Sequence, residues 1–154
     1  MTQDPTQPDA APPHLPPPDP RALRDAFGCF MTGVTVVTTL DSAGKPLGFT
    51  ANSFSSVSLD PPLLLVSIAN SSANLASFTT GAGSGAGFAV NILSEGQKDV
   101  SGIFARRSDD RFATVYWRQG PVGSPLIAGV SAWFDCRLEQ AIPAGDHTLL
   151  IGRV

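Results

Sequence analysis

The stretch Val-Thr-Val-Val-Thr-Thr-Leu at residues 34–40 decides the fold class of this chain. Six of its seven residues are β-branched, and such side chains favour strands. Residues 41–44, Asp-Ser-Ala-Gly, have the composition of a turn, and residues 46–59 read as a second long strand or a pair of strands. Asp-Pro-Pro at residues 60–62 then interrupts the pairing, because proline cannot donate a hydrogen bond to a sheet.

Outward from this region, strands outnumber helices. Four more segments have the apolar composition of strands, the first of them apolar enough for burial on both faces: residues 63–68, 88–93, 127–140 and 147–154. Three segments carry helix signals, namely Asp19-Pro20 to Gly33 with apolar positions 23, 26, 27, 30 and 31 on one face, residues 72–78, and a helix after the capping box of Ser94 and Gln97. Because long alternation of strands and helices is absent, we predict a mainly β protein, a small antiparallel barrel with two or three flanking helices.

Composition divides the chain into a tail and one domain. Residues 1–20 contain eight of the fourteen prolines, three acidic residues and no lysine or arginine. Such a segment offers little apolar surface to offset its chain entropy, so we expect a disordered tail. Residues 21–154 then form a single domain, in which ten acidic and ten basic residues balance. This neutrality argues against a nucleic-acid partner.

The remaining composition indicates a cytoplasmic protein. No apolar run approaches the roughly 20 residues that a membrane helix needs, and no secretory signal precedes the domain. Cys29 and Cys136 are far apart in the sequence and both have apolar neighbours. We therefore expect two reduced cysteines in the core, and no metal site.

Small polar residues mark two candidate ligand segments. Residues 48–58 combine glycine and alanine, which let a planar ligand approach the backbone, with hydroxyl and amide groups. Residues 69–74, Ala-Asn-Ser-Ser-Ala-Asn, open a short helix whose N–H groups could attract a phosphate. Each has an ordinary alternative, a solvated strand face for the first segment and a simple helix cap for the second.

Charged residues offer two further candidates. Arg106, Arg107 and Arg111 could capture a phosphate, or form an exposed loop with its own ion pairs. His147 follows Gly145 and Asp146, and Asp146 could orient its ring, although a lone histidine near a strand start is commonly structural. The glycine-rich residues 81–87 lack a lysine and precede a strand, so we expect a flexible connection there and no nucleotide loop.

The order of these signals resembles that of the short-chain flavin reductase family. The matching stretches are residues 23–27, 32–39, 48–58, 60–62, 90–93, 104–105, 111–112, 123–127 and 145–147. The resemblance covers residues 21–154. It implies an FMN-binding split barrel, a six-stranded Greek-key barrel that is usually a homodimer.

The resemblance also implies a site and an activity. The flavin, FMN or FAD, would lie against one set of residues and receive hydride from NADH or NADPH; these residues are Thr50, Ala51, Asn52, Ser53, Asn70, Ser71, Ser72 and Asn74. Arg106 and Arg107 would lie near its phosphate end. Gly145, Asp146 and His147 would line the nicotinamide side, with His147 as the catalytic candidate that positions the ring. Reduced flavin would then pass to a partner flavin-dependent monooxygenase.

Two alternatives stay open. The chain could be a flavin-binding electron carrier that reacts poorly with NADH, or an inactive, truncated paralogue. The second arises because family members continue past the Gly-Arg-Val matched by residues 152–154 into a further strand. We therefore expect the final strand to be missing and a barrel edge to be unpaired.

Overall fold

The structure, a computed structural model, describes residues 16–80, 87–106, 108 and 110–154. It divides the chain into two units, residues 1–31 and 32–154. Three of the sequence-based expectations fall outside the described residues: most of the tail (1–15), the glycine-rich connection (81–86) and Arg107.

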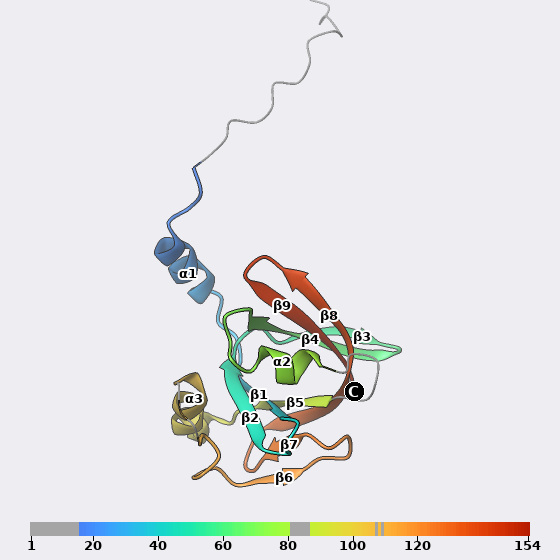
Figure 1. The fold of residues 1–154 in the computed structure, drawn as a ribbon. Helices are drawn as coiled ribbons and strands as arrows, with labels where there is room; N and C mark the ends of the chain where they lie inside the picture. The colour runs from blue at the N-terminus through green and yellow to red at the C-terminus, as the bar shows by residue number, and fades with distance from the viewer. Residues whose placement is uncertain (1–15, 81–86, 107, 109) are drawn as a thin grey trace, which may run out of the picture. The chain divides into compact units, whose positions relative to one another are not determined.

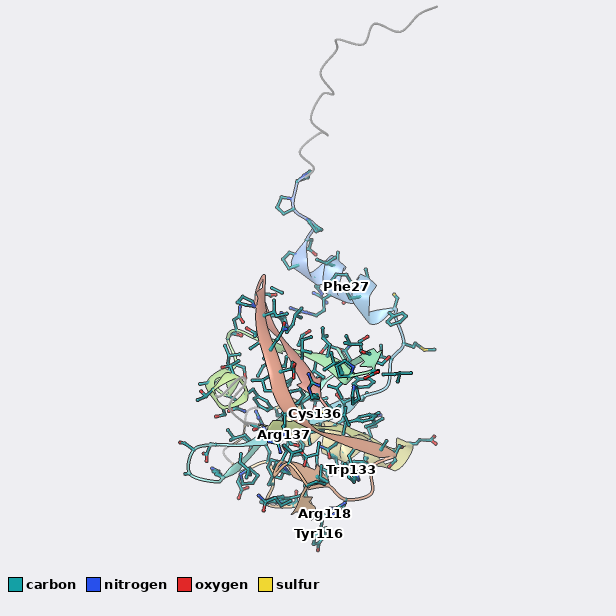
Figure 2. The ribbon with its side chains drawn as sticks, turned by 90° about the vertical axis from the view of Figure 1, so that its right-hand side faces the viewer. Phe27, Tyr116, Arg118, Trp133, Cys136 and Arg137 are labelled. Carbon is teal, nitrogen blue, oxygen red and sulfur yellow. The ribbon has the colours of Figure 1, made fainter. Side chains whose placement is uncertain are left out.

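Residues 16–31, the described part of the first unit, contain one short helix, α1 (Pro20–Gly28), which Figure 2 shows carrying Phe27. As expected, Asp19 caps it, with its carboxylate accepting a 2.9 Å hydrogen bond from the backbone N–H of Ala22. The helix ends at Gly28, five residues before the expected glycine. Cys29 is exposed, so the prediction of a core cysteine is wrong here. Its apolar sequence neighbours are themselves exposed and build no core around it.

The second unit is built on one antiparallel sheet. Among the described residues its strands are β1 (Thr35–Leu40), β2 (Pro46–Ala51), β3 (Ser55–Leu59), β4 (Pro62–Ala69), β5 (Gly87–Ile92), β6 (Trp117–Gln119), β7 (Pro125–Ile127), β8 (Ala132–Ala144) and β9 (His147–Arg153). Seven of them form the sheet in the order β2-β1-β5-β8-β9-β4-β3, and β6 and β7 form a separate hairpin (Figure 1). The sheet curves until β2 approaches β4, which gives the expected split barrel with one strand more than the six implied.

Residues 46–59 form a pair of strands, β2 and β3, which is one of the two arrangements expected. Three differences from the sequence-based expectations remain. Strand β8 extends to Ala144. The short strand β6 was not predicted. Strand β4 is not buried on both faces, because Leu64, Val66 and Ile68 point inward while the residues between them are only partly buried. An apolar run therefore overestimates burial where one face of the strand is only partly covered.

Where the structure describes the second unit, three short helical segments flank the sheet: α2 (Leu75–Thr79), the 3₁₀ turn η1 (Glu95–Gln97) and α3 (Lys98–Ala105). The capping box is confirmed, since the backbone N–H of Ser94 donates to Oε1 of Gln97 at 3.1 Å. Helix α3 buries Phe104, with Val100 and Ile103 packed beside it as expected. None of the helices among the described residues has both the length and the apolar character that a membrane crossing requires.

Two hydrophobic clusters lie on opposite faces of the sheet, because successive residues of a strand point to opposite sides. One contains Val37, Phe88 and Cys136, which confirms burial of this second cysteine. The other contains Val36 and Phe104, and β7 closes it. Arg118 of β6, the hairpin partner of β7, lies 5.3 Å from the centre of the Trp133 ring, and Figure 2 labels both residues.

The sheet has two unpaired edges in the part of the chain that the structure describes. Strand β9 is paired along both sides, with β4 and with β8. Within the described residues, the strands with an unpaired side in this sheet are β2 and β3. The last strand of the chain is therefore an interior strand.

Candidate functional site

A cavity of about 540 Å³ is lined by residues of β2, of the connection from β4 to α2, and of the end of α3. Figure 1 labels these elements. Its described lining combines apolar, aromatic and small polar residues with one charged side chain: Pro46, Leu47, Gly48, Phe49, Thr50, Ala69, Ser71, Ser72, Ala73, Asn74, Phe104, Ala105, Ser108, Arg111 and Phe112. Volume and composition are those of a small-molecule site.

The first wall of this cavity consists of β2 and the aromatic residues of α3 and the loop after it. The rings of Phe104 and Phe112 pack edge to face, with centroids 4.9 Å apart. Gly48 of β2 faces them so closely that a Cβ atom at this position would lie 2.9 Å from the Phe104 ring. The glycine therefore allows the aromatic pair to sit directly on the strand.

Arg111 joins this wall together. Its Nη1 donates to the carbonyl of Gly48 at 2.7 Å, and its Nε donates to the carbonyl of Arg106 at 2.8 Å. Among the described lining residues it is the one with a charged side chain. Sequence reasoning noted Arg111 as one of three arginines but did not select it; the Arg-Phe pair at 111–112 was the available signal.

The second wall is the connection between β4 and α2. Its residues Ser71, Ser72 and Asn74 line the cavity, and all three belong to the segment predicted to contact a ligand. The helix begins later than expected, at Leu75, and the backbone N–H groups of Ser72, Asn74 and Leu75 already donate within the connection. This wall therefore presents hydroxyl and amide side chains, and its N–H groups are largely engaged.

Of the four residues predicted along β2, only Thr50 lines the cavity. Its hydroxyl donates to the carbonyl of Ser101 on α3 at 2.7 Å, which leaves the oxygen able to accept. Ala51 lies in the hydrophobic core, and Asn52 is exposed beyond the end of β2. Ser53 accepts a hydrogen bond from the backbone N–H of Ser67 at 2.9 Å.

The Gly145-Asp146-His147 segment lies beside the second wall. Gly145, at φ +62°, makes the turn between β8 and β9, and His147 pairs with Ala69, which lines the cavity. Nδ1 of His147 lies 2.7 Å from Oδ1 of Asp146. This hydrogen bond, and secondarily the charge of the imidazolium, holds the pKa of Asp146 below its ordinary value.

Asn70 connects this turn to the second wall. Its backbone N–H donates to the carbonyl of Asp146 at 2.9 Å, and its side chain contacts Gly145 and Thr148. Arg106, by contrast, lines a different hollow beside Lys98 and Asp99. The structure thus brings together most of the predicted residues of the second wall and the turn, and separates them from Ala51, Asn52, Ser53 and Arg106.

The described residues contain no group of three or more His, Cys, Asp or Glu side chains that could hold a metal ion. Within this part of the chain, the chemistry of the cavity is that of hydrogen-bond donors and acceptors, aromatic faces and one guanidinium.

Comparison with known proteins gives consistent results. The family model of the flavin reductase like domain matches residues 27–154. The chain is 63% identical over 136 residues to a probable flavin reductase of Rhizobium meliloti (strain 1021). It is also 63% identical over 134 residues to the reductase component of a flavin-dependent trigonelline monooxygenase of Acinetobacter baylyi.

These alignments cover 88% and 87% of this chain but 42% of each relative, so the chain spans less than half the length of these proteins. Among solved structures, it is similar to the NADH:FAD oxidoreductase SgcE6 of Streptomyces globisporus C-1027 in complex with NAD and FAD fragments. The TM-score is 0.81 at 43% identity, with 91% of this chain and 82% of that chain covered.

Proposed function

Because the chain belongs to the flavin reductase-like family, we propose that its cavity binds FMN or FAD and that the protein reduces this flavin with NADH or NADPH. The observation that carries the proposal is the cavity itself: a hollow with polar and aromatic walls and one guanidinium, bordered by an Asp-His pair. The relatives named flavin reductase support the same activity.

The described residues fit such a cofactor. The volume of about 540 Å³ lies in the range of small-molecule sites. Phe49, Phe104 and Phe112 supply apolar surface for a flat ring system, and Thr50, Ser72 and Asn74 supply hydrogen bonds for its polar edge. We assign the phosphate end of the flavin to Arg111, because a guanidinium binds phosphate oxygens well.

A bound flavin supplies the acceptor for a hydride from the reduced nicotinamide. The residues of this chain would bind and orient the two ring systems, with no side chain acting as a nucleophile. His147 would position the nicotinamide, and Asp146 would hold the imidazole through Nδ1. Thr50 and Asn74 would offer polar contacts to the flavin edge, where charge develops during reduction.

We further propose that the reduced flavin serves a separate flavin-dependent monooxygenase. The name of the Acinetobacter relative, the reductase component of a flavin-dependent trigonelline monooxygenase, supports this proposal. A homodimer and a cytoplasmic location also remain proposals, which the composition and the family resemblance favour. Ala51, Asn52, Ser53 and Arg106 lie outside this cavity, and their roles toward the flavin stay predictions. Mass measurement of the purified chain in solution tests the dimer.

The experiment that tests the activity uses the whole chain. Purified protein should bind FMN or FAD, seen as a yellow colour and as quenching of flavin fluorescence, and NADH or NADPH should bleach the bound flavin. His147→Ala should keep flavin binding and slow the bleaching by about 100-fold, the scale expected when a reacting ring is misplaced. Stopped-flow absorbance measures this rate, and an unchanged rate would remove His147 from its assigned role.

The same experiment separates the two alternatives. An electron carrier would bind flavin tightly and bleach slowly with either nicotinamide, and an inactive paralogue would bind no flavin. The Asp146-His147 pair beside the cavity favours the reductase over the carrier, because a carrier has no need for a second ring-binding position.

A further inference from the structure

We propose that Asn70 is a positioning residue: it fastens the β8–β9 turn, and with it His147, to the second wall of the cavity. The inference rests on the proposed function, because it assigns a role in nicotinamide binding. It also changes the sequence-based expectation, in which Asn70 was a direct cofactor ligand.

Three hydrogen bonds carry the proposal. The backbone N–H of Asn70 donates to the carbonyl of Asp146 at 2.9 Å, and its Nδ2 donates to the carbonyl of Gly145 at 3.2 Å. Its Oδ1 accepts from the hydroxyl of Thr148 at 2.8 Å. Since a carbonyl can only accept, the amide nitrogen must face Gly145, and this fixes the orientation of the amide group. The side chain thus uses its nitrogen and its oxygen on the turn.

The position of Asn70 explains why the turn needs this fastening. Strands β4 and β9 are paired from Leu63 opposite Arg153 to Ala69 opposite His147, and the ladder stops there. Asp146 and Gly145 lie beyond its end, exposed, and glycine adds backbone freedom at this point. Asn70, the first residue after β4, therefore holds the β8–β9 turn to the end of β4 at a point beyond the last β4–β9 pair.

The position of His147 depends on Asn70, because the residues directly before and after the histidine both form hydrogen bonds with Asn70. Asp146, which holds the imidazole Nδ1 at 2.7 Å, has its carbonyl bonded to Asn70. Thr148, the residue after His147, is buried and bonded to the Asn70 amide. The residue after Asn70 is Ser71, which lines the cavity. Asn70 therefore fixes the position of His147 relative to the wall that would contact the flavin.

The test compares Asn70→Ala with the matched control Asn74→Ala. Both remove one amide, but Asn74 lines the cavity and its side chain makes no cap hydrogen bond. We expect Asn70→Ala to lower kcat/KM for NADH roughly tenfold, as the loss of two hydrogen bonds predicts, and to leave the Kd for FMN within about twofold. Asn74→Ala, a change at the proposed flavin edge, should instead raise the Kd for FMN.

A second variant, Thr148→Val, removes only the hydroxyl from the same network and keeps the shape of the side chain. It should lower kcat/KM for NADH by about threefold, the value of a single hydrogen bond. If Asn70→Ala does not fold, this variant alone decides the matter, and an unchanged kcat/KM would overturn the proposal.

Amide hydrogen exchange of the flavin-free protein provides a measurement that needs no activity. Residues 145–148 should exchange faster in Asn70→Ala than in wild type, and Asn74→Ala should leave them unchanged. Equal exchange in all three proteins would overturn the proposal. A weakened FMN affinity with an intact NADH rate in Asn70→Ala would also overturn it and make Asn70 a ligand. Failure of the wild-type chain to bind flavin would instead refute the proposed function.

Discussion

The two walls of the cavity are built by different forces. The first, formed by β2, α3 and the following loop, depends on close packing: Gly48 lies under Phe104, and Phe104 packs on Phe112. The second, formed by the β4–α2 connection and the neighbouring β8–β9 turn, depends on hydrogen bonds among polar and mostly exposed residues such as Asn70 and Gly145.

This difference teaches where each wall is sensitive. Packed interiors tolerate little added volume, so damage to the first wall should reduce the stability of the whole domain. Hydrogen bonds at an exposed turn contribute little net stability but set geometry. Damage to the second wall should therefore alter the reaction with the nicotinamide while the domain stays folded.

The largest effect should come from Gly48→Val. The new side chain would meet the Phe104 ring at 2.9 Å and the carbonyl of Val37 at 3.1 Å, and the backbone atom cannot move aside cheaply. We expect the free energy of unfolding to fall by about 3 kcal/mol, the upper part of the range for overpacking. Urea unfolding followed by fluorescence measures it.

Gly96→Ala is the control, because a Cβ there has no neighbour within 4 Å. It should change the free energy of unfolding by less than about 1 kcal/mol. Equal stability of Gly48→Val and wild type would show that the first wall is looser than its packing indicates.

An intermediate effect is expected from Arg111→Gln. This change removes the positive charge of the cavity, and with it the proposed phosphate contact, and it loosens the tie to Gly48. Hydrogen bonds to charged groups contribute about 1.5–3 kcal/mol, so the Kd for FMN should rise at least about tenfold. The Kd for riboflavin, which has no phosphate, should rise much less. Fluorescence titration measures both.

Arg106→Gln serves as the comparison, since Arg106 belongs to the same loop but lines another hollow. We expect the smaller rise in its Kd for FMN; a rise as large as that of Arg111→Gln would support the sequence-based placement of Arg106 near the phosphate end. If Arg111→Gln raises the Kd for FMN and the Kd for riboflavin equally, Arg111 shapes the first wall without contacting a phosphate.

The smallest effect concerns the hydrophobic core, which belongs to neither wall, and it is a dependence of stability on pH. Burial, and secondarily the charge of Asp135, raises the pKa of Cys136 from 9.0 to about 12. Above pH 9 the unfolded chain ionises this thiol and the folded protein does not, so stability should fall as pH rises. The loss should reach about 1.4 kcal/mol by pH 10. In Cys136→Ala, this contribution to the fall in the free energy of unfolding between pH 8 and pH 10 should disappear, whatever the absolute stability of the variant. Urea unfolding at several pH values measures it.

Much of the fold could be predicted because its signals are local. The β-branched run at 34–40, the turn at 41–44 and the capping box at Ser94 each involve residues close together in the sequence, and the structure has all three. The short strand β6 escaped prediction because three exposed residues carry no periodic pattern. Cys29 was misplaced because apolar neighbours in sequence do not ensure a partner in space.

The candidate site divides in the same way. Ser71, Ser72 and Asn74 stood out as a polar cluster within six residues of sequence, and the cavity includes them. Arg111 and Gly48 were not selected, because their roles appear only when residues 63 positions apart in the chain form a 2.7 Å hydrogen bond. The sequence around Asn70 gives no sign of the turn that this residue contacts 75 positions later.

The amino-acid sequence by itself determined the strands, the turns, the family resemblance and the kinds of chemical group available for a flavin and a nicotinamide. Local backbone preferences and residue types suffice for these. Only the tertiary structure decided which of those groups share a cavity, that a guanidinium belongs to it, and that Asn70 faces a turn. Those facts depend on the curvature of the sheet, which brings distant segments together at distances that no local pattern encodes.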